Sequence, residues 1–430
     1  MRALGWSCGY FFCVLASYYI LRPIRDEMAV AGGVENIPWL FTGTLLAMLF
    51  ANPVFTALVS KLPRLQFIST TYRFFILTLL GFFVILNWGS PDLNVWAGRL
   101  FYVWTGVFSL FVVSVFWAFM ADTFSAEQST RLFGFIAFGG TFGGVLGSAL
   151  TATVTSFLPP VSLLILAALL LELAVHSMTK LSASATANLS TPPVDGIQGQ
   201  INDPALDFDD VSYGRFDRPI GGGLFSGISN ILRSKYLAGI SGYMLLFTVT
   251  ATFLYFQQAG IVAETFEGRA LRTSVFARID LLVNALTLVT QIFITGRIVK
   301  RLGVAFTLAI LPAICAVGFL LLGFTPTLLA LVIFQVLRRA ANFAIARPTR
   351  ETLFTVLRRE DKYKAKSFID TFVYRAGDQI GAWAWASMAA TGLTLAGVAF
   401  VSVPLSLVWL VLGIWLGRRQ KETILRRSRA

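Results

Sequence analysis

The feature of this sequence that most restricts its fold is a set of long apolar runs. Residues 4–21 and 393–416 contain no charged side chain. About 20 apolar residues in a helix cross the roughly 30 Å hydrocarbon core of a membrane. Backbone groups in lipid must bond to one another, so each run is expected to be a helix; the alternating pattern of a membrane β-barrel is absent. Because 56% of the residues are hydrophobic and only 13% are charged, we predict an all-α polytopic membrane protein.

Twelve membrane-spanning helices are predicted along the chain. They cover residues 4–22, 37–59, 67–87, 95–120, 131–157, 160–180, 236–258, 273–298, 303–322, 327–347, 366–391 and 393–417.

The positions of lysine and arginine indicate on which side each loop lies. With the N-terminus in the cytoplasm, 25 of the 35 Lys and Arg residues fall in cytoplasmic segments and 4 in the opposite ones. Cytoplasmic loops carry such an excess, so both termini are predicted to be cytoplasmic. The first run has no small-residue cleavage site before Arg22 and is expected to remain as the first span. No organelle-targeting segment precedes it, which favours the inner membrane of a bacterial cell.

The composition changes between spans six and seven. Residues 181–232 are rich in Ser, Thr, Pro, Gly and Asp and are predicted to form a flexible cytoplasmic linker. The linker separates an N-terminal six-helix bundle at 1–180 from a C-terminal six-helix bundle at 233–417, which a basic cytoplasmic tail follows at 418–430. Two such halves with a substrate site between them form the major facilitator plan. Glycines at four-residue spacing in spans five and eleven are interpreted as helix-packing positions: Gly139, Gly143, Gly147, Gly377 and Gly381.

The remaining composition excludes several kinds of function. The formal net charge of +13 is explained by the loop lysines and arginines, so no nucleic-acid partner is expected. The three cysteines lie in apolar runs and His176 is the sole histidine, so we expect no metal site, no cofactor and no enzyme active site. The expected partners are the lipid bilayer and a small solute, and the protein is expected to act as a monomer.

Span ten carries the strongest functional signal. Gln335, Arg338, Arg339 and Asn342 follow one another at i, i+3, i+4 and i+7, which places them on one face of a helix. Arg338 falls near the middle of the membrane, where a charge is costly and usually faces a cavity or a partner. Guanidinium groups bind phosphate and carboxylate through paired hydrogen bonds. A static ion pair is the alternative, with Asp280, Asp370 or Asp378 as the partner.

Two other spans carry polar groups at membrane depth. In span eleven, Asp370, Tyr374 and Asp378 share a face, and Arg375 is set to one side. In span eight, Asp280 begins a polar stripe that is compatible with a helix–helix seam and with a transport path. The excess of deep positive charge favours an anionic substrate over a cationic one.

The end of span one is also charged. Tyr18, Arg22 and Arg25 lie on one face and are followed by Asp26 and Glu27. This position is near the outer mouth, where long side chains can reach water, so snorkelling explains them without a further role.

Three stretches resemble a known family. Residues 21–38 read Leu-Arg-Pro-Ile-Arg-Asp-Glu-Met-Ala-Val-Ala-Gly-Gly-Val-Glu-Asn-Ile-Pro. Residues 347–357 read Arg-Pro-Thr-Arg-Glu-Thr-Leu-Phe-Thr-Val-Leu, and 364–370 continue with Lys-Ala-Lys-Ser-Phe-Ile-Asp; Phe116-Trp117 and Ala121-Asp122 form a third anchor. These segments resemble the ATP:ADP antiporters of plastids and intracellular bacteria, a branch of the major facilitator superfamily.

The resemblance implies a nucleotide or another phosphorylated substrate and an exchange mechanism. Arg25 and Arg350 stand where that family has substrate-related lysines. Gly106 and Tyr255 stand where it has functional carboxylates, and this departure leaves the exchanged compound open.

Together these observations predict a secondary transporter that exchanges an anionic solute, such as ATP or ADP, by alternating access. Arg338, Arg339, Asn342 and Arg375 are predicted to hold phosphate or carboxylate groups, and Asp370 and Asp378 to pair with those arginines in the empty site. Arg25 and Arg350 are predicted to guide or gate the substrate. Gating or coupling roles are assigned to five acidic residues: Asp26, Asp280, Glu351, Asp370 and Asp378.

Two alternatives remain open from the sequence. The first is a proton-coupled facilitator for another solute, in which Asp280 or Asp378 carries the proton. The second is a protein of transporter fold that no longer transports, and that uses the linker at 181–232 and the basic tail as contact surfaces of a sensor or scaffold.

Overall fold

The computed structural model describes residues 2–124, 126–189, 234–293, 295–357, 365–366 and 368–429, and within these ranges the regular elements are helices. The N-terminal half contains α1 (Arg2–Ala31), α2 (Ile37–Lys61), α3 (Arg64–Trp88), α4 (Pro91–Thr123), α5 (Ala126–Val154) and α6 (Leu163–Leu189). The C-terminal half contains α8 (Lys235–Thr265), α9 (Arg269–Phe293), α10 (Thr295–Phe324), α11 (Leu328–Ala341), α12 (Arg347–Thr352), α14 (Tyr374–Ala390) and α15 (Leu395–Arg429).

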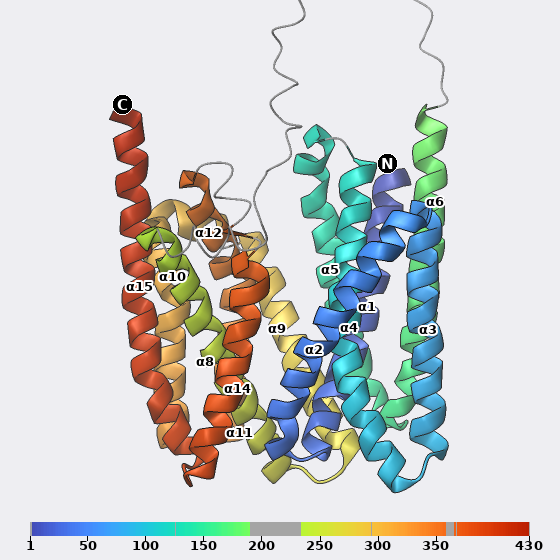
Figure 1. The fold of residues 1–430 in the computed structure, drawn as a ribbon, viewed down its shortest axis with the longest axis horizontal. Helices are drawn as coiled ribbons and strands as arrows, with labels where there is room; N and C mark the ends of the chain where they lie inside the picture. The colour runs from blue at the N-terminus through green and yellow to red at the C-terminus, as the bar shows by residue number, and fades with distance from the viewer. Residues whose placement is uncertain are drawn as a thin grey trace, which may run out of the picture.

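The predicted all-α fold with twelve spans is confirmed. Eleven helical segments in the described ranges are long and apolar enough to cross a membrane. The twelfth is α14, which has only 17 residues and is more polar because it carries Arg375 and Asp378. Figure 1 shows two bundles side by side, with both chain termini at one end of the molecule. We call this the terminal end, and the opposite one the far end.

Two helices contain segments wound as π-helix. Asn342–Ala346 is π-helical and joins α11 to α12, so that one span runs from Leu328 to Val356. A second π-helical segment, Ile369–Val373, leads into α14. Such segments are rare and are frequent at functional sites.

Each half has its own apolar core, and the two cores meet at the far end. Large side chains such as Phe101 and Phe116 fill the N-terminal core, and Phe253 and Phe334 fill the C-terminal one. The C-terminal cluster also includes Ala29, Val30, Ile37 and Leu40 from the N-terminal half. These four residues belong to the end of α1 and the start of α2, so the bundles are in apolar contact there.

The four-residue spacing of glycines proves to be a packing feature within each bundle. A Cβ atom on Gly143 of α5 would lie 2.3 Å from the carbonyl oxygen of Phe12 in α1. A Cβ atom on Gly381 of α14 would lie 2.9 Å from Cβ of Thr252 in α8. The glycines therefore permit close helix approach, as the sequence predicted.

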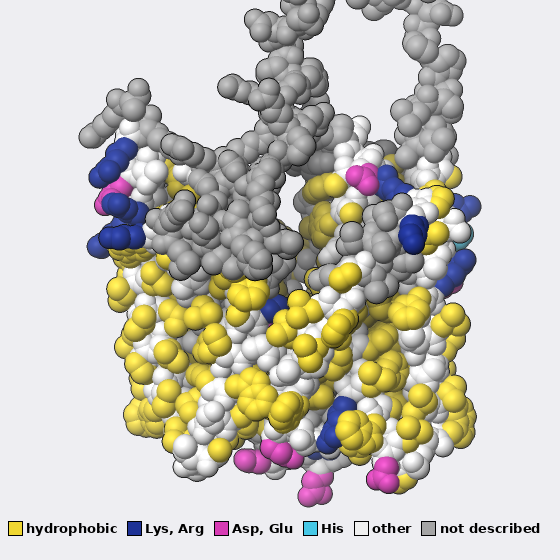
Figure 2. All heavy atoms as spheres, in the orientation of Figure 1, with side chains coloured by type: hydrophobic (Ala, Val, Ile, Leu, Met, Phe, Trp, Pro, Cys, Tyr) yellow, Lys and Arg dark blue, Asp and Glu magenta, His cyan; other side chains and the backbone are white. Residues whose placement is uncertain are grey.

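The surface agrees with a position in the membrane. Apolar side chains form a broad band across the visible face, and charged side chains lie mainly at its two ends, with Lys and Arg gathered at the terminal end (Figure 2). Leu77, Val317 and Leu329 are among the exposed large apolar residues. An apolar surface of this extent is expected against lipid rather than water.

Two helices extend past the predicted ends of their spans. Helix α6 continues to Leu189, into the region predicted to be linker from residue 181, and the rest of that linker lies outside the described residues. Helix α15 continues to Arg429, so the predicted basic tail at 418–430 is helical over residues 418–429. Neither extension contains Pro or Gly, and Ala, Leu, Arg, Lys, Gln and Glu within them favour a continued helix.

Candidate functional site

A cavity of about 980 Å³ lies between the two bundles. Helices α1, α2 and α4 line it on one side, and α8, α11, α12 and α14 on the other. Seven arginines and four carboxylates stand in its walls, so the cavity has a surplus of positive charge.

The two walls of the cavity differ in chemistry. Helices α2 and α4 contribute mainly apolar groups, among them Phe41, Met48 and Leu110. The wall from the C-terminal half holds most of the charge, with five of the seven arginines. A solute with one anionic end and one apolar or ring-shaped part would match both walls.

Arg338 is a buried guanidinium that lines the cavity without a carboxylate partner. Its exposed fraction is 5%, and its Nε and Nη2 atoms have no hydrogen-bond partner among the described residues. No ion pair found in the described part of the chain includes it. Its guanidinium carbon lies 5.5 Å from the centroid of the Phe247 ring, a cation–π contact that compensates only part of the lost hydration.

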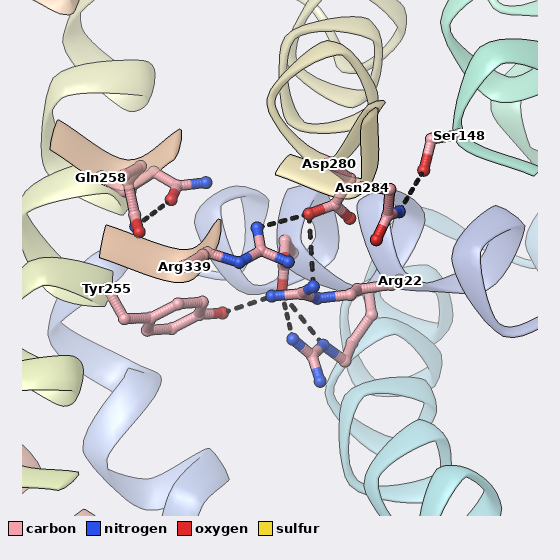
Figure 3. A network of polar contacts seen from close by, with 10 residues as sticks. Arg22, Ser148, Tyr255, Gln258, Asp280, Asn284 and Arg339 are labelled. Atoms are coloured by element: carbon pink, nitrogen blue, oxygen red, sulfur yellow. Dashed lines mark hydrogen bonds and ion pairs between the residues drawn. The ribbon is translucent and has the colours of Figure 1, made fainter. Parts of the chain in front are cut away.

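Arg339, the next residue, is paired. Its Nη1 atom donates to Oδ1 of Asp280 at 2.5 Å, and the same oxygen lies 3.2 Å from Nη1 of Arg22 (Figure 3). Asp280 is only 3% exposed. Because Arg22 comes from α1 and Asp280 from α9, this ion pair joins the two bundles. The snorkelling interpretation of Arg22 was therefore wrong: the side chain turns inward because a buried carboxylate from the other bundle meets it there.

Asp26 forms a second connection between the bundles. Its Oδ1 atom lies 2.6 Å from Nη2 of Arg25 and accepts a hydrogen bond of 3.2 Å from the Tyr255 hydroxyl of α8 (Figure 3). Arg25 also lies over the Tyr102 ring, with its guanidinium carbon 5.1 Å from the centroid. Arg25 and Asp26 thus both belong to the floor of the cavity, at its far end.

A third connection lies farther along α1. The buried Oε1 atom of Glu27 is 3.8 Å from Nη2 of Arg272 and 4.0 Å from Nε of Arg269, both on α9. Glu27 is 2% exposed. Together with the pairs of Arg22 and Asp26, it gives the last turns of α1 three polar contacts with the C-terminal half.

Helices α2 and α14 close the far end from another side. The Trp39 and Trp383 rings meet edge to face with their centroids 4.9 Å apart. The Thr42 hydroxyl lies 3.0 Å from Oε1 of Gln379 and 3.2 Å from Nε1 of Trp383. The far end is therefore held shut by contacts of α1 and of α2.

The acidic residues toward the terminal end have local partners. Asp378 lies 3.4 Å from Nη1 of Arg375, a pairing that the sequence predicted. Asp370 lies 4.0 Å from Nη2 of Arg350, and Glu351 pairs with Lys366. The expectation that Asp370 would pair with Arg338 or Arg339 was wrong, because the π-helical turn and α12 bring Arg350 to it first.

The polar stripe on α9 is part of a helix–helix seam. Asn284 donates from Nδ2 to the Ser148 hydroxyl of α5 at 3.4 Å, and the Ser274 hydroxyl donates to the Ala152 carbonyl at 3.2 Å. Asp280 and Asn284 are not among the residues that line the cavity. Between the two interpretations left open for this stripe, the structure thus favours the seam.

The predicted face of span ten points into the cavity, because Gln335, Arg338, Arg339 and Asn342 all line it. Arg375, which the sequence placed to one side of the polar face of its span, lines the cavity as well. Arg350, Glu351, Asp370 and Asp378 also line the cavity. The sequence reasoning missed Arg22 and Gln258. The signal for Arg22 was its spacing with Arg25, and for Gln258 it was an amide pair, Gln257-Gln258, at the end of an apolar span.

Among the described residues, no group of three or more His, Cys, Asp or Glu side chains is placed to hold a metal ion. Cys8, Cys13 and Cys315 are free thiols.

The chain was compared with known proteins. ADP,ATP carrier protein 2 of Chlamydia pneumoniae is 22% identical over 214 residues, which cover 44% of this chain and 40% of that carrier. The crystal structure of the nucleoside transporter NupG superposes with a TM-score of 0.61 at 12% identity, over 96% of this chain and 97% of that one. A bacterial homologue of the iron transporter ferroportin, in an inward-facing state, gives 0.59 at 14% identity, over 97% and 96%.

These solved structures show that the fold is that of membrane transporters, at identities too low to indicate a substrate. The family profile provides the assignment, because it extends over both bundles, from residue 7 to residue 357. The chain belongs to the Major Facilitator Superfamily.

Proposed function

We propose that this protein is a secondary transporter that moves a small anionic solute, most favourably a nucleotide or another phosphorylated compound, by alternating-access exchange. The observation that carries the proposal is Arg338, a buried guanidinium that lines the cavity with two unpartnered nitrogen atoms. Burying a charge without a partner is costly, and a phosphate or carboxylate group would satisfy it. The planar fork of a guanidinium matches such groups bidentately.

The remaining arginines support an anion of more than one charge. Arg350 and Arg375 line the same cavity toward the terminal end, and each has one carboxylate partner, at 4.0 Å and 3.4 Å. Pairs as long as these are weak enough to exchange a carboxylate for a substrate phosphate. A solute with two or three phosphate groups would then extend from Arg338 toward Arg350.

The closed far end supports alternating access. The cavity is bounded there by Arg22–Asp280, by Asp26–Tyr255 and by the α2–α14 contacts. In the proposed cycle the bundles rock about the cavity, so that these contacts break while the terminal end closes. We further propose that both termini lie in the cytoplasm, which makes this the inward-open state.

Arg338 also provides a reason for exchange instead of free return. When both ends are shut around an empty cavity, its charge has neither water nor a counter-ion, and this raises the energy of the closed intermediate. A bound anion removes that penalty. The empty carrier is therefore expected to return slowly, and the loaded one rapidly.

Similarity to a carrier of ADP and ATP supports a nucleotide as the solute, although the match covers 40% of that protein. The two positions at which this chain lacks the carboxylates of the antiporter family, Gly106 and Tyr255, both line the cavity. At the second position, Asp26 of α1 accepts a hydrogen bond from Tyr255. A carboxylate is therefore present beside Tyr255, supplied by a different helix.

Counterflow in proteoliposomes tests the proposal. The full chain would be reconstituted with unlabelled ATP, ADP, another nucleotide or phosphate inside and labelled ATP or ADP outside. Uptake that requires internal nucleotide is the expected result. Uptake that follows a pH gradient and ignores internal solute would favour a proton-coupled facilitator, and no uptake of any anion by folded protein would favour a sensor or scaffold.

A further inference from the structure

Two buried glutamines meet at the floor of the cavity. Gln258 of α8 and Gln335 of α11 both line it, and each is 5% exposed. Nε2 of Gln335 donates a hydrogen bond to Oε1 of Gln258. Oε1 of Gln335 is buried and has no partner among the described residues. This bond leaves the NH₂ group of Gln258 and the amide oxygen of Gln335 unused, which are one hydrogen-bond donor and one acceptor. If both amides were flipped, the pair would still have one unused donor and one unused acceptor.

Such a pair differs from an ordinary polar seam between helices. Buried polar atoms in folded proteins nearly always have a partner, and an orphaned acceptor carries a penalty. Gln257, the residue before Gln258, also has a buried Oε1 atom without a partner among the described residues, but its Nε2 donates to the Leu395 carbonyl at 2.6 Å and it does not line the cavity. What distinguishes Gln335 is that its unsatisfied oxygen belongs to a residue of the cavity wall, beside a second amide, and this combination favours a ligand.

Three aromatic rings stand at the same end of the cavity. Phe41 of α2 lies with its ring centroid 5.7 Å from that of Tyr255 and 6.3 Å from that of Tyr102. All three line the cavity, and they come from both bundles. Figure 3 shows Tyr255 and Gln258 on neighbouring turns of α8. Rings at these distances offer faces and edges on which a flat group can stack.

We propose that this floor is the subsite for a flat heterocycle that presents a donor beside an acceptor, such as a nucleobase. The subsite consists of Gln258, Gln335, Phe41, Tyr102 and Tyr255. Paired hydrogen bonds from an amide to a base edge are a common mode of base recognition. This inference rests on the proposed function, because it assigns the phosphate end of the same solute to Arg338.

The order of residues along α11 agrees with a solute whose base end lies at the floor and whose phosphate end lies toward the terminal end. Gln335 and Arg338 are three residues apart on one helical face, with Arg338 about 4.5 Å closer to the terminal end. The cavity of about 980 Å³ is within the size range of sites that enclose a molecule with a base, a sugar and phosphates. A nucleotide would then lie with its base at the floor and its phosphates toward Arg350.

Ligand-induced thermal stabilisation of the purified full chain would test the subsite. The probes are ADP, ribose 5-phosphate and inorganic pyrophosphate, and the variants are Gln335→Leu, Gln258→Leu and, as the matched control, Gln257→Leu. We expect the apparent Kd for ADP to rise roughly tenfold or more in the first two variants. The leucine cannot hydrogen-bond to the edge of the base, which would then be buried without a partner. The Kd for pyrophosphate should stay within about twofold in all three, and Gln257→Leu should leave the ADP value unchanged.

A second pair of variants covers the case in which an amide variant does not fold. Phe41→Leu keeps the apolar volume and removes the ring, whereas Phe41→Tyr keeps the ring. Weaker ADP binding in the first and retained binding in the second would support stacking. Ribose 5-phosphate or pyrophosphate binding as tightly as ADP would overturn the base subsite and leave anion transport standing. Failure of every phosphate compound to bind would overturn both proposals.

Discussion

Arg338 and Arg339 are adjacent in sequence and have opposite environments. Both line the cavity, but Arg339 has Asp280 of α9 at 2.5 Å, whereas Arg338 lies over the Phe247 ring and has no carboxylate partner among the described residues. Consecutive residues on an α-helix point about 100° apart, so one side chain of such a pair can reach a neighbouring helix while the other cannot. Whether an arginine of this site has a carboxylate partner therefore depends on the direction in which its own side chain points.

Replacing the unpaired arginine should affect stability and transport in opposite directions. Arg338→Gln is expected to stabilise the empty carrier by about 1–3 kcal/mol, because it removes a buried charge without a partner. The same change should lower counterflow of labelled nucleotide at least about 100-fold, since it removes the charge that holds the anion. Thermal unfolding in detergent and counterflow measure the two effects.

The exposed arginine of the Arg419–Glu422 pair provides the control for that change. Arg419→Gln should alter neither stability nor transport appreciably, because exposed pairs contribute about 0–1 kcal/mol. Wild-type counterflow in Arg338→Gln would refute the role assigned to Arg338.

Asp280 should be needed for stability, because it is the carboxylate between two buried arginines. Asp280→Asn is expected to lower the free energy of unfolding by about 3–5 kcal/mol, since it leaves Arg22 and Arg339 without a counter-charge. Chemical or thermal unfolding of the purified protein would measure this loss. Adding Arg339→Gln to that variant should restore part of the stability, and purely additive losses would show that the pair is not coupled.

At the scale of single helices, the π-helical segment Asn342–Ala346 changes which residues face the cavity. On an unbroken α-helix, Arg347 would lie nine residues from Arg338 and therefore about 180° away, facing out of the cavity. A π-helical turn takes an extra residue and rotates everything beyond it. In the structure Arg347 and Arg350 both line the cavity with Arg338.

Close contact between α1 and α5 should make Gly143 intolerant of a side chain. A Cβ atom there would lie 2.3 Å from a backbone oxygen of α1, which cannot move aside as a flexible side chain can. Gly143→Ala is expected to destabilise the protein by about 1–3 kcal/mol. Gly134→Ala on the same helix meets nothing within 4 Å and should be neutral or slightly stabilising. Equal melting temperatures for the two variants would contradict the close packing.

At the scale of the whole molecule, the two bundles are joined at the far end and separated by the cavity toward the terminal end. The contacts between the bundles come from α1 with α8 and α9, from α5 with α9, and from α2 with α14. They include polar and ionic pairs between helices as well as apolar contacts. Contacts of this kind can break and re-form as units, which a transport cycle requires.

Locking the far end should stop transport. Thr42→Cys with Gln379→Cys, in a background without the three native cysteines, places thiols on α2 and α14 where the native side chains are 3.0 Å apart. A short bifunctional thiol reagent is expected to abolish counterflow, because the far end can no longer open.

The matched control for this cross-link is a pair within one bundle. Arg73 and Glu172, on α3 and α6, lie 3.2 Å apart and are both exposed. A cross-link between cysteines at these positions should leave counterflow intact. Full transport after complete cross-linking of the first pair would contradict the rocking motion of the bundles.

The sequence by itself determined the number of spans and their apolar character, because membrane thickness and helical periodicity act over short stretches of chain. It also predicted that Gln335, Arg338, Arg339 and Asn342 share a face. It did not predict the partners of the charges. Arg22 meets Asp280 only because α1 and α9 come together at the far end, and Arg350 reaches Asp370 only after a π-helical turn. Which charge remains unpaired is a property of how distant helices pack, and tertiary structure alone decides it.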